Sequence, residues 1–132
     1  MRDMLLPLPV QKARALSLEY HLALSVLAAR RGGQDEAIRL MQAVYHARFM
    51  QGSGSGDAAL LGMAETALDD MVARVDAGGA WVVSDAEQVA IANAIAIHDR
   101  LTNTVPYHRF AAAWERMQYF GRQLQEAQEA AA

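Results

Sequence analysis

The chain has 132 residues, of which 53% are apolar, and it carries no cysteine and a net charge of −3. This length suits one domain, and the apolar residues are numerous enough to form a hydrophobic core without disulfides or a structural metal. A disordered chain and a disulfide-dependent scaffold are therefore excluded. The net negative charge also argues against a nucleic-acid-binding protein, which needs basic side chains to contact the phosphates.

The first ten residues hold one basic side chain, two prolines and no cleavage-site pattern, unlike a secretory signal. No apolar run reaches the roughly 18 residues that cross a bilayer. Because neither a secretory signal nor a membrane span is found, we expect a cytoplasmic protein with no membrane contact, and the absence of cysteine also suits a reducing compartment. All basic residues except Lys12 are arginine, which indicates a GC-rich bacterial genome.

Apolar residues recur with helical spacing through nearly the whole chain, interrupted by glycine and proline. The spacing predicts a first helix over residues 10–31, after Pro9 and before a pair of glycines, and a second over 34–51. Glycine and serine alone make up residues 52–56, which indicates a flexible loop. Three further helices are expected after this loop, over residues 57–77, 85–101 and 106–126.

Ser84 and Glu87 have the spacing of a capping box at the start of the fourth helix, in which each side chain bonds the other residue's amide. From Ala86 to Ile97 this helix is apolar on nearly every side, whereas the second and third helices have ordinary polar faces. We therefore predict one all-α domain, residues 1–132, built as a bundle of about five helices with the fourth helix central.

The apolar stripe of the fifth helix holds more aromatic residues than that of any other helix. We expect this stripe to pack mainly within its own subunit. The first, fourth and fifth helices together offer more apolar surface than five helices can cover, so we predict a homodimer. The candidate partner surface consists of six residues of the fifth helix: Tyr107, Phe110, Trp114, Met117, Tyr119 and Phe120. Tyr119 and Phe120 lie off the stripe and are expected nearest the interface.

An acidic face is the second candidate contact surface, for another protein partner, although such a face is also typical of simple solvation. It consists of four residues of the third helix: Glu65, Asp69, Asp70 and Asp76.

Four histidines fall on four expected helices: His21, His46, His98 and His108. None follows a glutamate by three positions, as di-iron bundles require, and no HExxH motif is present. We expect His21 and His46 on solvent-facing stripes. A cluster of His98, Asp99 and His108 is a candidate acid–base group, but no nucleophile accompanies it. We therefore expect no metal, no cofactor and no catalysis.

These features predict a non-enzymatic, self-associating protein-interaction module that acts as an adaptor, an inhibitor or an immunity-type partner. The alternative is a dimeric DNA-binding transcriptional regulator, because residues 1–33 hold five basic and two acidic side chains whereas residues 34–103 hold four and ten. Its candidate nucleic-acid contacts are Arg30, Arg31, Arg39 and Arg48. A ligand- or metal-binding bundle is the third hypothesis.

Overall fold

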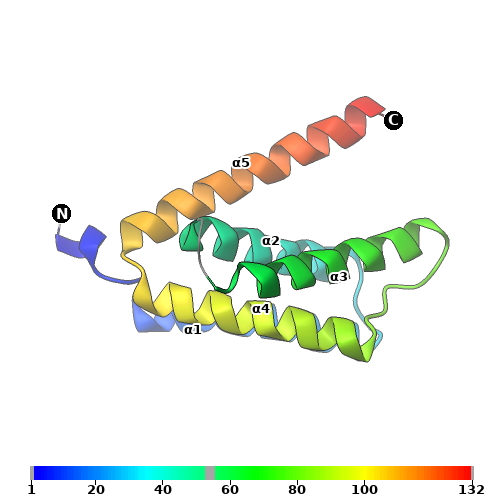
Figure 1. Cartoon of the computed structure of the whole chain (residues 1–132), viewed down its shortest axis with the longest axis horizontal. Coiled ribbons are helices and arrows are strands. Elements are labelled where there is room, and N and C mark those ends of the chain that lie inside the picture. Colours follow the sequence, from blue (N-terminus) through cyan, green and yellow to red (C-terminus); the bar gives the residue numbers. More distant parts are fainter. Residues whose placement is uncertain (1, 53–55, 132) are drawn as a thin grey trace.

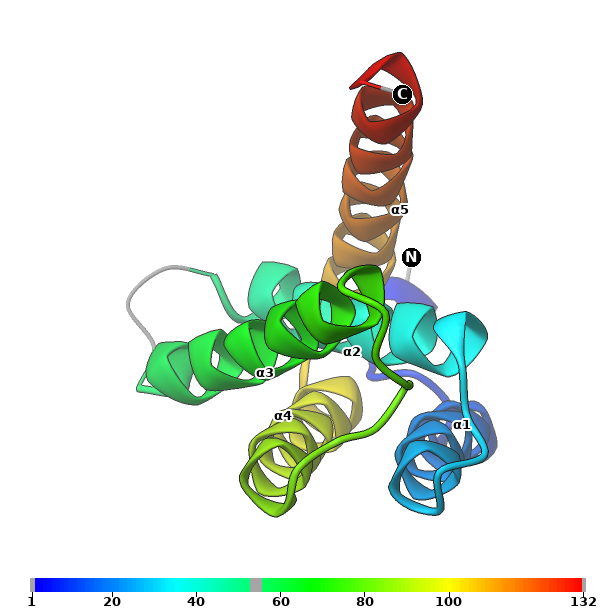
Figure 2. The same cartoon turned by 90° about the vertical axis from the view of Figure 1, so that its right-hand side faces the viewer.

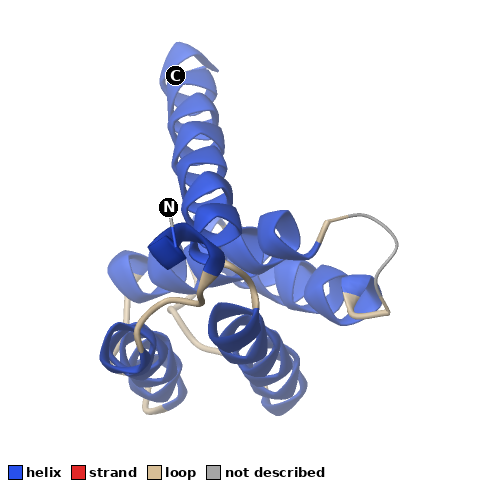
Figure 3. Ribbon diagram, turned by 90° about the vertical axis from the view of Figure 1, so that its left-hand side faces the viewer, coloured by secondary structure: helices blue, strands red, loops and turns tan. Residues whose placement is uncertain are grey.

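The computed structural model describes residues 2–52 and 56–131, and every regular element in these ranges is a helix (Figures 1 and 3). A short 3-10 helix, η1, precedes five α-helices, and the predicted all-α bundle is confirmed. The elements are η1 Arg2–Leu5, α1 Val10–Ala28, α2 Gln34–Gln51, α3 Ala58–Asp76, α4 Asp85–Thr104 and α5 Tyr107–Ala131.

The first helix ends three residues earlier than predicted, because Arg30 takes the left-handed conformation that glycine was expected to supply. Its φ is 62°, and the Arg31 amide donates to the Val26 carbonyl at 3.0 Å, which closes the last turn. Gly32 serves a different purpose, since a Cβ there would lie 2.6 Å from Cδ2 of the buried Leu27.

The five α-helices form two layers with one helix outside them. In Figure 2, α2 and α3 lie above α1 and α4, and α5 rises away from the far side of α2. Helix α4 packs against α1, α2 and α3, so its predicted central position is confirmed. Helix α2 packs against α1, α3, α4 and α5, so it is more enclosed than its polar face indicated.

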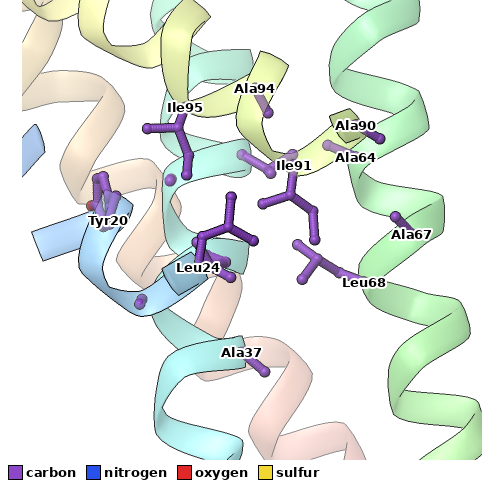
Figure 4. Close-up of a cluster of buried hydrophobic side chains, with 14 of the residues drawn as sticks. Tyr20, Leu24, Ala37, Ala64, Ala67, Leu68, Ala90, Ile91, Ala94 and Ile95 are labelled. Atoms are coloured by element: carbon purple, nitrogen blue, oxygen red, sulfur yellow. The ribbon is translucent and has the colours of Figure 1, made fainter. Parts of the chain in front are cut away.

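The main core lies where α4 meets the neighbouring helices. Ile91 and Ile95 are each 1% exposed and point toward Tyr20, Leu24 and Leu68 (Figure 4). Small side chains on α3 and α4 line the contact between these helices and allow their close approach. They are Ala64, Ala67, Ala90 and Ala94. One side of α4 remains at the surface, as the largely exposed Val89 shows.

The predicted capping box at the start of α4 is confirmed. The Ser84 hydroxyl accepts from the Glu87 amide at 3.1 Å, and Glu87 Oε1 accepts from the Ser84 amide at 2.8 Å. Arg74 on α3 donates to both carboxylate oxygens of Glu87, at 2.7 and 2.8 Å. The Arg74 guanidinium, together with the Ser84 amide, holds the pKa of Glu87 below its usual range. The cap therefore also ties α4 to α3.

Replacing Ser84 with Ala is expected to lower the free energy of unfolding by about 1 kcal/mol, because the Glu87 amide loses its acceptor at the helix end. Urea denaturation followed by circular dichroism measures the change. Ser25→Ala is the matched control, since Ser25 is an exposed residue inside α1 and alanine favours the helix. Equal unfolding midpoints for the two variants would contradict the capping role.

Candidate functional site

Helix α5 leaves the bundle about halfway along its length. Its buried residues are Ala113 and Met117, whereas every residue from 121 to 131 is exposed. Figures 1 and 2 show this second half projecting clear of the other helices; we call residues 121–131 the free half of α5. Most helices in proteins depend on tertiary packing because an isolated helix this short is marginal in water. The free half lacks such packing within its own chain.

Aromatic contacts attach the first half of α5 to α2. The rings of Phe110 and Trp114 meet the His46 ring edge-on, with centroids 4.5 and 5.1 Å away. Phe120 lies 4.9 Å from Tyr45 and 6.2 Å from Phe49, measured between ring centroids. Through these contacts, much of the predicted aromatic stripe packs within its own subunit.

Of the six residues predicted as a partner surface, most therefore have neighbours inside the chain. Tyr107 stacks on Phe110 with ring centroids 6.1 Å apart, and Met117 is buried. The expectation that Phe120 lies off the packed stripe is wrong, because the packed side of α5 includes Ala113 and Phe120 as well as Trp114. Tyr119 is 56% exposed and remains available at the surface.

An open groove of 440 Å³ lies at the base of the free half, between α2, α3 and α5. Its aromatic residues are Tyr45, Phe49, Tyr119 and Phe120. The Tyr45 hydroxyl donates to Glu65 at 3.0 Å, and Arg48 pairs with Glu65 at 3.2 Å. Burial, followed by the hydrogen bond to Glu65, raises the pKa of Tyr45 to about 12. Apolar rings beside a few fixed polar groups are typical of a surface that contacts a protein partner.

Two histidines form a buried hydrogen-bonded pair between α2, α4 and α5, which contradicts the predicted exposure of His46. His46 Nδ1 lies 2.9 Å from His98 Nε2, and His46 Nε2 lies 3.1 Å from the Phe110 carbonyl oxygen. Because a carbonyl only accepts, we assign the His46 proton to Nε2, so that His46 Nδ1 accepts from the His98 Nε2–H. The Thr102 hydroxyl then donates to His98 Nδ1 at 3.4 Å.

Burial keeps this histidine pair neutral. Desolvation lowers the pKa of His46 to about 4 and that of His98, with the His46 charge adding to the effect, to about 3. Tyr20 on α1 covers His98 with its ring edge-on at 5.0 Å. All four ring nitrogens of this buried, neutral pair have hydrogen-bond partners. The pair therefore connects α2, α4 and α5.

The candidate cluster of His98, Asp99 and His108 does not form. His98 bonds to His46 instead, and Asp99 Oδ2 lies 3.0 Å from His21 Nε2 on α1. His108 is exposed on the first turn of α5. Neighbours in sequence at the end of α4 thus point to different helices, because successive residues of a helix are about 100° apart.

The acidic residues of α3 do not act as one face. Glu65 turns toward Tyr45 and Arg48 in the groove, while Asp69, Asp70 and Asp76 are exposed. Partial burial, with the charges of Glu65 and Asp70, raises the pKa of Asp69. The exposed acidic surface of α3 is therefore smaller than predicted.

The four arginines of the DNA-binding alternative are spread over α2 and its approach. Arg39 pairs with Glu19 at 3.4 Å, and Arg48 pairs with Glu65. Arg30 and Arg31 are exposed before α2, whose first residue, Gln34, lies about 20 Å along the helix axis from Arg48 at 1.5 Å per residue. The fold does not gather these side chains into one basic surface.

Within the described ranges, no three His, Asp or Glu side chains are grouped to hold a metal ion. None of the helices in this part of the chain is long and apolar enough to cross a membrane. No family model, curated protein or solved structure matches the chain.

Proposed function

We propose that the protein is a helical interaction module that self-associates, and that the free half of α5 makes the contact. The broad class is that of adaptors, inhibitors and immunity-type partners, which work by binding a protein instead of by catalysis. The exposure of every residue from 121 to 131 supports the proposal. A helix that projects into solvent without tertiary contacts is stabilised when a second protein covers it.

The apolar pattern of α5 supports the same conclusion. Ala113, Met117 and Phe120 lie against the bundle, and the same alternation of three and four residues continues at Leu124 and Ala127. Leu124 is 45% exposed. The apolar side of α5 that packs against the bundle in the first half of the helix thus continues into the free half. There, no other part of a single copy covers it.

Light scattering at micromolar concentration is expected to give about twice the chain mass of 14.4 kDa. Leu124→Arg should return the mass to that of one chain, because it places a charge in the contact. The matched control is Leu18→Arg on α1, where Leu18 is 67% exposed, and this variant should stay dimeric. A parent mass near 14.4 kDa at every concentration would overturn the proposal, and dissociation by Leu18→Arg alone would move the contact to α1.

A further inference from the structure

The buried pair of His46 and His98 lies where α5 meets the rest of the molecule. We propose that mild acid releases α5 from the bundle as a unit, with this histidine pair as the sensor, while α1–α4 stay folded. The inference concerns a single chain and does not rest on the proposed self-association. Release uncovers the packed side of α5 and opens the groove that α5 forms with α2 and α3.

Helix α5 packs on a small hydrophobic cluster of its own. In this cluster the buried Ala113 lies with Met50 of α2 and with Val105, which follows α4. The main core lies between α1, α2, α3 and α4 and contains no buried residue of α5. Leu101 on α4 packs against both clusters. Because α5 packs mainly on α2, with a further contact to η1, it can leave without opening the main core.

The hydrogen bonds of the histidine pair form a chain with one direction. The Thr102 hydroxyl donates to His98 Nδ1, His98 Nε2 donates to His46 Nδ1, and His46 Nε2 donates to the Phe110 carbonyl of α5. One added proton fits only if the first two of these bonds reverse, and it then places a charge in a dry site. A second proton leaves two N–H groups facing each other 2.9 Å apart. The docked geometry therefore resists protonation.

No side chain around the pair compensates such a charge. Tyr20 covers the pair from α1, and burial raises its own pKa, so it stays neutral. Asp99 on α4 bonds to His21 on α1. Arg109 on α5 donates to the Met50 carbonyl and is itself positive. In the part of the chain that the structure describes, neither imidazole of the pair has a carboxylate partner.

Release of α5 relieves this resistance at His46. Phe110 and Trp114 of α5 cover the His46 ring, so water reaches the ring once α5 leaves, whereas Tyr20 still covers His98 from α1. The pKa of His46 is about 4 with α5 docked and returns toward 6.5 in water. The released state thus binds more protons. Its population is expected to rise about twentyfold between pH 7 and pH 5.

Thiol labelling tests the release in the full chain, which has no cysteine of its own. Ala113→Cys reports the contact of α5, and Ala94→Cys, buried on α4 in the main core, is the matched control. The reagent is 4,4′-dithiodipyridine, and each rate is divided by that of the same variant unfolded in urea at the same pH. Position 113 should react about twentyfold faster at pH 5 than at pH 7. At pH 5 it should react at least about tenfold faster than position 94.

Two further substitutions in the Ala113→Cys chain test the sensor. His46→Gln removes the titrating group and should reduce the rise at position 113 to less than about threefold. His108→Gln changes an exposed histidine of α5 and should keep the full rise. Equal corrected rates at positions 113 and 94 at both pH values would overturn the proposal, because α5 would then open only with the whole domain. A full rise in a folded His46→Gln variant would overturn it as well. The comparison of positions 113 and 94 keeps both histidines, so it tests the release even where His46→Gln does not fold.

Discussion

Acidification from pH 7 to pH 5 is expected to lower the free energy of unfolding by about 4 kcal/mol, with His46 and His98 as the cause. Burial lowers the pKa of His46 to about 4 and of His98 to about 3, whereas both groups titrate near 6.5 in the unfolded chain. Between these values the unfolded state binds more protons than the folded state. Stability is therefore fully present above about pH 6.5 and falls as the pH drops toward the folded pKa values.

Urea denaturation at several pH values between 7 and 5 measures this dependence. Glu36 and Glu87, whose pKa values are lowered from 4.5, lose their contribution only below about that pH, so they do not account for a change above pH 5. The double variant His21→Gln, His108→Gln removes the two exposed histidines and should keep the full dependence. A flat stability profile in that variant would show that the buried pair does not resist protonation.

Helix positions and caps could be predicted because they depend on neighbours in sequence. The capping box of Ser84 and Glu87 requires only their spacing, and the central position of α4 follows from its apolar surface. The predicted ends of the helices were less accurate, since α1 is shorter and α5 is longer than the apolar pattern indicated. Arg30 in a left-handed conformation ends α1, and sequence favours glycine for that role.

The buried histidines could not be predicted from periodicity. His46 shares a helix face with Asp35, Arg39 and Gln42, which indicated solvent exposure. That face is covered at its C-terminal end because α5 crosses α2 there, with Phe110 and Trp114 against the His46 ring. Such a crossing depends on the direction in which α5 leaves the turn after α4, and no local pattern reports it.

The packed face of α5 was misassigned for a related reason. The predicted stripe passes through Trp114, whereas Phe110, Ala113, Met117 and Phe120 follow the same helical spacing on the side of α5 that meets the bundle. The structure buries Ala113 and leaves Trp114 partly exposed, since a small residue lets α5 approach α2 closely. Phe120 consequently packs inside the subunit, and the apolar stripe continues into the free half at Leu124.

Replacing Ile95 with Asp is expected to cost several kcal/mol, enough to unfold a domain of ordinary stability. Ile95 is 1% exposed and lies in the core with Tyr20 and Leu24, so the carboxylate would lose its water without gaining a partner. Thermal unfolding followed by circular dichroism measures the effect. The control is Ala96→Asp, the same new side chain on the next residue, which is exposed and should cost less than about 1 kcal/mol. If both variants melt within a few degrees of the parent, Ile95 does not lie in the core and α4 is not the central helix.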